Sequence, residues 1–332
     1  MIRPFPKPWP FNSIPEPTPA DWGVGVTVCV ASFAKDEAIV GITDSMLSTV
    51  DMSSDNVAIK FFAIGEKWCA MYAGNDISPV PPIKRFVRSK LSPADAPETL
   101  PDVVCAFQDA FRQQLKERAE SQVLGSFGLT VSELLSRGLN QFGPEIFSRL
   151  VYEIENVKLD LSFLVCGFDD CGPHMFVIQG KGEVSYYDIP GFWAVGSGQT
   201  SALGTLFSRN ASASMIFMGV PYILYTLCKA KFNAETALGV GKEATAFVLA
   251  SDGSRYLIHS EAIERIKRIW EKVRPPEIPN EAKQALPAII KEARRQSKNR
   301  FRRIARMKRA KEATQPPAEQ VKADAKSAGE GQ

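Results

Sequence analysis

Histidine is scarce in this chain of 332 residues, which contains only His174 and His259. Both lie in predicted strands beside residues that suit packing or a surface edge, so we expect structural roles for them. The scarcity disfavours Ser-His-Asp and Cys-His catalytic groups, and also a hydrolytic metal site built on histidine ligands. It does not disfavour an enzyme whose first residue supplies its own α-amino group as the base, because the pKa of such an amine is about 8.

Paired cysteines are also missing. The six cysteines stand singly in apolar segments, without a CxxC pair or a nearby histidine. This spacing indicates neither a zinc site nor a disulfide framework. We therefore expect reduced thiols in the core of a cytoplasmic protein, and no pattern predicts a metal ion or a cofactor.

Long apolar segments are absent as well. The best candidate, from Met215 to Leu227, is too short to span a bilayer, so we expect a soluble protein without a membrane span. Residues 1–22 are rich in proline and lack the apolar run of a secretory signal, and we interpret them as an extended arm or a removable propeptide. No GxxxxGK loop occurs, so energy-dependent unfolding of a substrate would require another chain.

The hydrophobic pattern predicts strands and helices in alternating groups. Short strands with tight turns occur from Gly23 to Ala73, from Leu159 to Val195 and from Thr245 to Ser260, and helical periodicity fills the intervals. A doubly wound parallel sheet would need strands and helices to alternate singly. The order therefore favours an α+β protein, and we predict a four-layer αββα sandwich with a C-terminal basic helical extension.

These patterns divide the chain into an arm at residues 1–22, a main domain at 23–260 with a helical insertion at about 125–156, a basic helical extension at 261–313 and a disordered tail at 314–332. Between Lys291 and Lys311, eleven of 21 residues are lysine or arginine. Such a segment is typical of a solvated helix, and equally of a contact with nucleic-acid phosphates, an acidic partner or an anionic membrane. Few aromatic residues interrupt it, so base stacking is not indicated.

Lys60 is the most informative polar residue, because it stands inside the apolar strand VAIKFFAI. A lysine that points inward from such a strand needs a carboxylate partner, and Asp44 at the end of the second strand is the candidate. Lys60 follows Asp44 by 16 positions, and Gly74 follows Lys60 by 14. Taken alone, Asp44 also suits a cap for the next turn, and Gly74 suits a tight turn.

Four segments resemble the proteasome-like family of N-terminal nucleophile (Ntn) hydrolases, which comprises the A/B-type proteasome subunits and their bacterial relatives. These segments are GITDSMLST, NVAIKFFAIGEKWCAMYAGN, LSFLVCGFDDCGPHMFVI and FWAVGSGQTSALGTL. The resemblance covers roughly Gly23 to Ser260 and implies the αββα fold of that family. The two spacings around Lys60 are similar to those of archaeal β-subunits.

The resemblance implies a role for each candidate residue. It places Thr27 at the family's first residue, whose hydroxyl attacks and whose freed amine acts as the base. Asp44 and Lys60 are the charged pair that keeps this amine unprotonated. The Gly74 N–H is implied as the oxyanion donor, and Ser197 as a hydrogen-bond partner near the amine.

The chain departs from the family pattern at its start and before its last strand. Thr27 is the first residue only if the first turn holds one extra residue; otherwise Val28 takes that place. Val26 stands where active β-subunits carry glycine at the scissile bond. Glu235 replaces a later aspartate of the family as the candidate acidic residue. Cys29 is an alternative nucleophile or, more simply, a buried thiol.

Peptide or protein is the substrate that the resemblance implies. The predicted function is a self-processing threonine endopeptidase, and the alternative is a catalytically inactive scaffold subunit that oligomerises and binds a partner through its basic segment. A small-molecule amidase is a third interpretation. The family also implies a homo-oligomer, with a ring as one arrangement. The aromatic residues Phe142, Phe147 and Tyr152 suit either a subunit contact or core packing.

Overall fold

We describe the chain from a computed structural model. It describes residues 27–48, 53–54, 60–91, 98–237, 240–273, 278 and 280–314. The predicted arm at residues 1–22 and all but the first residue of the predicted tail lie outside these ranges.

The first sheet has five antiparallel strands in the order β10-β1-β2-β11-β12. The strands are β1 (Cys29–Ala34), β2 (Ala38–Asp44), β10 (Phe192–Val195), β11 (Ala244–Ala250) and β12 (Arg255–Ile258). Tight turns join β1 to β2 and β11 to β12, and the second turn has Gly253 at a φ of 79°, where a side chain would be strained. Both hairpins lie in segments for which the sequence pattern predicts short strands with tight turns.

The second sheet also has five antiparallel strands, and it follows chain order. The strands are β5 (Phe61–Ala63), β6 (Trp68–Gly74), β7 (Leu159–Asp169), β8 (Gly172–Gly180) and β9 (Glu183–Tyr186). Glycine turns connect β7 to β8 and β8 to β9, as the sequence predicts. A short ladder of β3 (Leu47–Ser48) and β4 (Ser53–Ser54) stands apart from both sheets.

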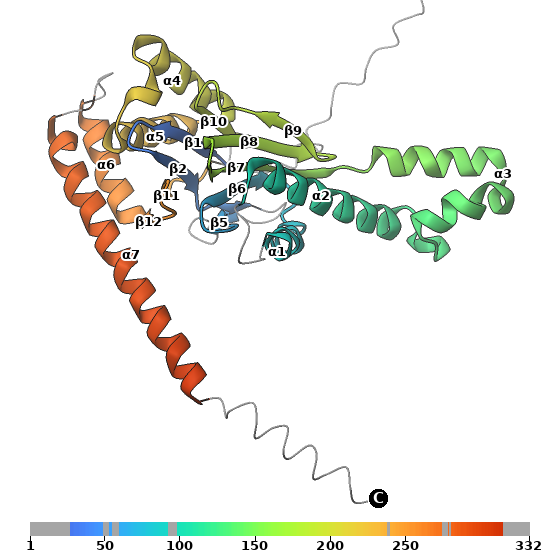
Figure 1. Cartoon of the computed structure of the whole chain (residues 1–332). Helices are drawn as coiled ribbons and strands as arrows, with labels where there is room; N and C mark the ends of the chain where they lie inside the picture. Colours follow the sequence, from blue (N-terminus) through green and yellow to red (C-terminus); the bar gives the residue numbers. More distant parts are fainter. Residues whose placement is uncertain are drawn as a thin grey trace, which may run out of the picture.

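Helices cover one face of each sheet (Figure 1). The first sheet is covered by α4 (Gln199–Ser212), α5 (Val220–Ala234), α6 (Ser260–Val273) and the first half of α7 (Asn280–Thr314). The second is covered by α1 (Val80–Lys90) and α2 (Leu100–Gln122). The remaining faces pack on each other through side chains such as Ala31 and Ile39 from one sheet and Met71 and Leu164 from the other. The protein is thus α+β with two antiparallel sheets.

Helix α3 (Val131–Asn156) extends away from the two sheets (Figure 1) and has a small apolar cluster of its own. It bends at Gly143, whose φ is 75°, directly before Pro144. The helical segment predicted at about 125–156 is confirmed, and Phe142 and Phe147 pack against the cluster. Tyr152 is 68% exposed.

Two details differ from what the sequence pattern predicts. The apolar periodicity from Ser214 to Phe232 predicts a helix, but α5 begins only at Val220, because Gly219 precedes it and a helix tolerates a proline such as Pro221 only in its first turn. A short 3-10 turn, Met215–Phe217, lies before it. The six cysteines are all free, but Cys105 and Cys171 are exposed rather than buried in the core.

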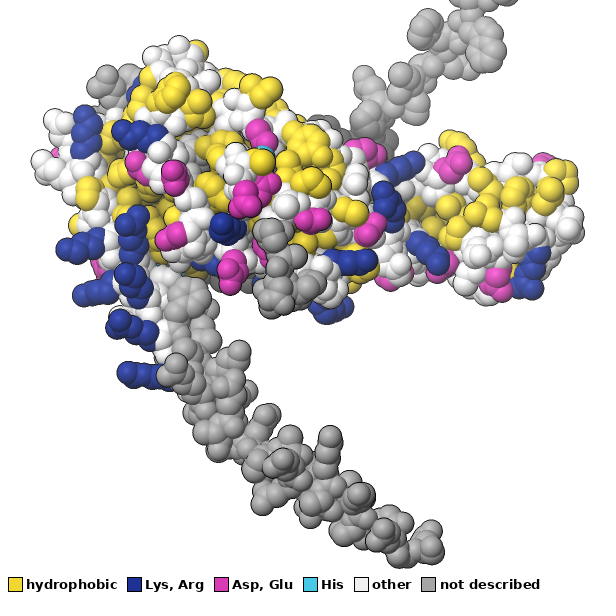
Figure 2. Space-filling model, in the orientation of Figure 1, with side chains coloured by type: hydrophobic (Ala, Val, Ile, Leu, Met, Phe, Trp, Pro, Cys, Tyr) yellow, Lys and Arg dark blue, Asp and Glu magenta, His cyan; other side chains and the backbone are white. Residues whose placement is uncertain are grey.

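The basic helical extension is present as α6 and α7, and Lys and Arg side chains follow the described part of α7 in Figure 2. Among the described residues, no helix has both the length and the apolar character needed to cross a bilayer.

His174 has the structural role that we expected. Its two ring nitrogens lie 2.8 Å from Asp188 and 2.9 Å from Asp169, and its ring stacks on Trp68.

Candidate active site

Thr27 lies two residues before the start of β1, where the two sheets meet. Its carbonyl oxygen accepts a hydrogen bond from the Gly198 N–H at 3.3 Å, and the neighbouring Val28 carbonyl accepts one from the Asp44 N–H at 3.2 Å. Side chains alternate along a strand, so Thr27 faces the same way as Cys29 and Ala31, which are part of the core between the sheets. The Thr27 side chain is therefore directed toward the second sheet and is only 3% exposed.

Lys60 joins the two sheets at this point. It stands immediately before β5, and its Nζ donates hydrogen bonds to the Thr27 hydroxyl and, at 2.9 Å, to Asp44 Oδ1. Lys60 is 3% exposed and Asp44 is fully buried. The predicted pairing of Lys60 with Asp44 is thus confirmed, and the pair contacts the hydroxyl of the candidate nucleophile.

Asp44 is held by a second donor. Its Oδ2 accepts a hydrogen bond from the Gly241 N–H at 3.0 Å, in the segment that leads into β11. Burial raises the pKa of the Asp44 carboxyl, while the Lys60 ammonium and the Gly241 N–H favour the ionised form and oppose that rise. Asp44 occupies the end of β2 and pairs with Ala244 of β11, so the sheet register brings Gly241 to it.

Ser197 contacts the backbone nitrogen of Thr27, as the sequence analysis predicts. The Thr27 N–H donates to Ser197 Oγ at 3.2 Å, and Ser197 Oγ donates to the Thr27 carbonyl at 3.3 Å. The preceding Gly196 has a φ of 100°, and a Cβ added there would lie 2.2 Å from the Thr27 carbonyl oxygen. Only glycine permits this close approach, so the GSG segment fixes the position of Thr27.

Gly74 is the last residue of β6, the strand that leads toward the Thr27 segment. A Cβ added at Gly196 would meet the Ala73 side chain at 3.2 Å, so the end of β6 reaches Gly196. A Cβ added at Gly74 itself would lie 2.3 Å from the Asp160 carbonyl oxygen. This packing alone demands glycine, and the role of the Gly74 N–H as an oxyanion donor stays a prediction.

Glu235 belongs to a neighbouring charged cluster. At the end of α5, its carboxylate accepts hydrogen bonds from Lys231 at 2.5 Å and from Lys267 of α6 at 2.6 Å. Lys231 is fully buried and also donates to the Lys242 carbonyl, one residue after Gly241. Burial lowers the pKa of Lys231, and Glu235 opposes that change.

This cluster adds three residues that the sequence analysis did not single out: Lys231, Gly241 and Lys267. They connect Glu235 to Asp44 through the segment at 240–242, because Gly241 donates to Asp44 while Lys242 accepts from Lys231. The positive charge of Lys231 also favours the ionised form of Asp44. Glu235 is thus linked to Asp44 through these intervening groups. Lysine within the apolar helix YILYTLCKAKFNA was the available signal for Lys231.

Cys29 does not have the chemistry of a nucleophile. Its thiol is completely buried, donates to the Thr43 hydroxyl and the Tyr72 carbonyl, and has a pKa that burial raises to about 12. A thiol is nucleophilic as its thiolate, which such burial suppresses near neutral pH.

Among the described residues, no group of three or more His, Cys, Asp or Glu side chains is placed to hold a metal ion.

Comparison with known proteins adds no family assignment. No model of a protein family matches the chain, and no curated protein matches it significantly.

Proposed function

We propose that this chain is a proteasome-like threonine hydrolase that cleaves peptide bonds after residues 1–26 have been removed. One observation carries the proposal: the Thr27 hydroxyl, the Lys60 ammonium and the Asp44 carboxylate form one buried hydrogen-bonded group. Buried, mutually paired ionisable groups beside a hydroxyl are typical of activated nucleophiles. The spacing of these residues and the order of the segments support the same family.

The proposed chemistry uses the chain's own first residue. Once the bond between Val26 and Thr27 is cleaved, the Thr27 nitrogen is a free amine beside Ser197. The amine accepts the hydroxyl proton while Oγ1 forms a bond to the substrate carbonyl carbon. The C–N bond then breaks, and the protonated amine gives its proton to the leaving nitrogen. Water hydrolyses the resulting ester, again with the amine as base.

Lys60 and Asp44 prepare this reaction electrostatically. A neighbouring ammonium favours the unprotonated form of the Thr27 amine and the deprotonated form of its hydroxyl. Asp44 holds the ammonium in place and balances its charge in the dry interior. Under this proposal the Gly74 N–H donates to the oxyanion, and Glu235 positions the segment at 240–242.

Under the same proposal, the two packed sheets and their helices are the four-layer αββα sandwich of Ntn hydrolases. The main domain then spans residues 23–260, with α3 as an insertion and α6 and α7 as an extension. Both sheets and all the helices that cover them support this arrangement.

A chain that begins at Thr27 tests the function. It can be produced as a fusion protein and released by a protease that cuts directly before Thr27, so that Thr27 becomes the N-terminal residue. Its hydrolysis of a mixture of short peptides can be followed by mass spectrometry. We expect hydrolysis by this form and by its Thr27→Ser variant, none by its Thr27→Ala variant, and none by a chain in which residues 1–26 are retained. Equal hydrolysis by the Thr27→Ala form would refute the proposal.

The second candidate is a catalytically inactive scaffold subunit, and α3 favours it. Leu135, Leu139 and Ile146 are each at least 50% exposed, and hydrophobic side chains are visible on α3 in Figure 2. Such exposure on a projecting helix is typical of a contact between subunits. This candidate predicts an oligomer that is lost when Leu135 and Leu139 are replaced by glutamate, whether or not residues 1–26 are removed. Light scattering after size-exclusion chromatography measures this.

A further inference from the structure

A cavity of about 390 Å³ lies between the edge strands of the two sheets, β5 and β12, where α7 closes the space between them. Its walls come from β5, β6, β11, β12 and α7. The residues that line it on the strand side include Phe61, Ala63, Cys69, Phe247 and Leu257, and α7 contributes Ala293, Gln296 and Ser297. Its volume lies in the range of small-molecule sites, roughly 300 to 1,000 Å³. None of the candidate catalytic residues lines it.

Arg255 supplies the charged group of this cavity. Its Nη2 donates to the Gly65 carbonyl at 3.0 Å, which anchors the guanidinium at the wall. Its Nη1 is buried and has no hydrogen-bond partner within the described ranges. A buried cationic donor without an acceptor is costly, so this nitrogen is suited to an acceptor that enters the cavity.

The nearest protein group is at most a weak acceptor. The charge of Arg255 and a side-chain hydrogen bond with it favour the Cys69 thiolate, but burial dominates and raises the pKa of Cys69 to about 11, so the sulfur stays a neutral thiol. The positive charge of Arg255 also favours the ionised form of the Glu98 carboxyl, but burial outweighs it and raises the pKa of that carboxyl. The guanidinium therefore retains a capacity for a further anion.

The remaining walls are largely apolar. Phe61 and Phe247 stack with their ring centroids 5.1 Å apart, one from each sheet, and Leu257 and Ala293 contribute further apolar surface. These surfaces favour a hydrocarbon or aromatic body rather than a sugar or a nucleotide, which needs several polar partners.

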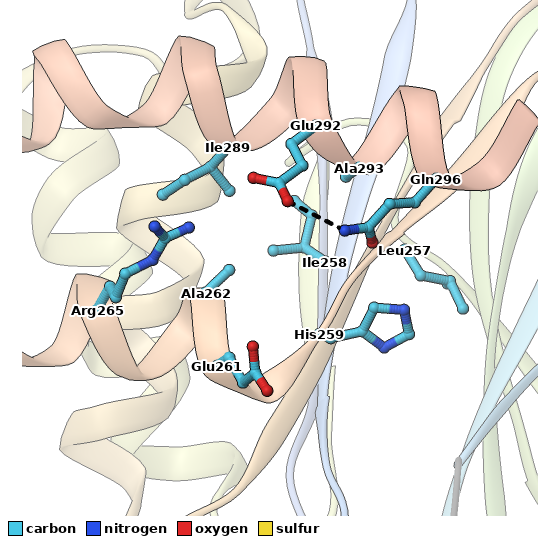
Figure 3. A pocket seen from close by; sticks show the side chains of 10 residues that line it. All are labelled: Leu257, Ile258, His259, Glu261, Ala262, Arg265, Ile289, Glu292, Ala293 and Gln296. Atoms are coloured by element: carbon cyan, nitrogen blue, oxygen red, sulfur yellow. Dashed lines mark hydrogen bonds between the residues drawn. The ribbon is translucent and has the colours of Figure 1, made fainter. Parts of the chain in front are cut away.

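A second cavity of about 380 Å³ adjoins the first between α6 and α7 (Figure 3). The two share Leu257, His259, Ala293 and Gln296. In Figure 3 the charged side chains of Arg265, Glu261 and Glu292 lie around this second space, and Glu292 accepts a hydrogen bond from Gln296. The second, more polar cavity thus lies beside the apolar one along α7.

We propose that the apolar cavity binds a small amphipathic carboxylate, such as a medium-chain fatty acid or an aryl carboxylate. Its carboxylate accepts a hydrogen bond from Arg255 Nη1, and its apolar body lies against Phe61, Phe247 and Leu257. A carboxylate matches the single available guanidinium nitrogen, whereas a phosphate would leave most of its oxygens without donors in this cavity.

Calorimetric titration of the full chain with decanoate, below its micelle concentration, tests this site. Decanol is the matched neutral probe, and Arg112→Met, on the exposed surface of α2, is the control for loss of an arginine. We expect saturable binding of decanoate that weakens about tenfold or more for decanol and for Arg255→Met, and stays unchanged for Arg112→Met. Absence of saturable decanoate binding, or equal affinity for decanol, would overturn the proposal.

A second variant keeps the proposal testable if Arg255→Met does not fold, which circular dichroism would reveal. Ala63→Leu adds bulk to the cavity wall on edge strand β5 and leaves the guanidinium in place. We expect it to weaken decanoate binding about tenfold while the chain retains its native unfolding transition. Unchanged affinity in this variant would place the carboxylate elsewhere and refute the site.

Discussion

The Lys60 ammonium lies 2.9 Å from the Asp44 carboxylate and also donates a hydrogen bond to the Thr27 hydroxyl. Almost no solvent reaches these groups, so their charges act strongly on each other and on the hydroxyl. A buried ion pair is a weak source of stability compared with apolar residues of similar volume. Under the proposed function the pair serves the chemistry of Thr27, and its effect on the free energy of unfolding can be measured.

Removal of either partner of the Lys60 and Asp44 pair should be strongly destabilising. Lys60→Met leaves a buried carboxylate without its cation, and Asp44→Asn leaves a buried ammonium, at a cost of about 3–5 kcal/mol each in the free energy of unfolding. The double variant should lose less than the sum by about 1 kcal/mol or more, because neither charge is then left alone. Urea unfolding measures all three values. Additive losses would show that the two groups do not interact.

Gly196→Ala should displace Thr27 and abolish hydrolysis in the form that begins at Thr27. The new Cβ would lie 2.2 Å from the Thr27 carbonyl oxygen, at a φ of 100° that side chains rarely adopt. We expect a loss of about 1–3 kcal/mol in stability from the strained backbone.

Gly204→Ala is the matched control for this change. Gly204 lies in α4, and a Cβ there meets no atom within 4 Å, so alanine should stabilise the helix by up to about 1 kcal/mol and leave hydrolysis unchanged. Full activity in Gly196→Ala would contradict the role that we assign to the GSG segment.

Glu235→Gln should destabilise the protein by about 3 kcal/mol or more, because it leaves the ammonium of the fully buried Lys231 without its carboxylate. It should also lower kcat, since the segment at 240–242 that holds Asp44 loses an anchor. Glu264→Gln on α6 removes an exposed carboxylate and should change the free energy of unfolding by less than about 0.5 kcal/mol. Equal effects of the two substitutions would rule out the positioning role of Glu235.

His174 predicts a pH dependence of stability. Burial alone would lower its pKa, but the hydrogen bonds to Asp188 and Asp169 outweigh this and raise the pKa above the usual 6.5. The folded state therefore binds the proton more tightly than the unfolded chain. The resulting contribution of His174 to the free energy of unfolding is complete below about pH 6.5 and is lost as the pH rises through the folded-state pKa.

Unfolding experiments across this pH interval check the sign. Relative to His174→Gln, the free energy of unfolding of the unmodified chain should fall as the pH rises above about 6.5. A stability difference that rises with pH would contradict the arrangement around His174.

The sequence could predict the Lys60 and Asp44 pair, because a lysine within an apolar strand has few ways to be satisfied. It could not single out Lys231, since Lys229 stands two positions earlier in the same helix and periodicity does not decide which ammonium is buried. Arg255 was missed for a similar reason: a charged residue at the start of an edge strand is usually solvated, whereas here α7 packs beside it. Hydrophobic patterns predict helices and strands, whereas the contacts of Lys231 and Arg255 depend on which helices and strands pack together.

The most direct test of the account is the intact mass and the N-terminal sequence of the protein purified from its own host. We predict a chain that begins at Thr27, because only then is the nitrogen beside Ser197 a base. The Thr27→Ala variant, expressed in the same host, should retain residues 1–26. An unmodified chain that keeps these residues in its mature form would contradict the threonine-hydrolase mechanism and favour the scaffold.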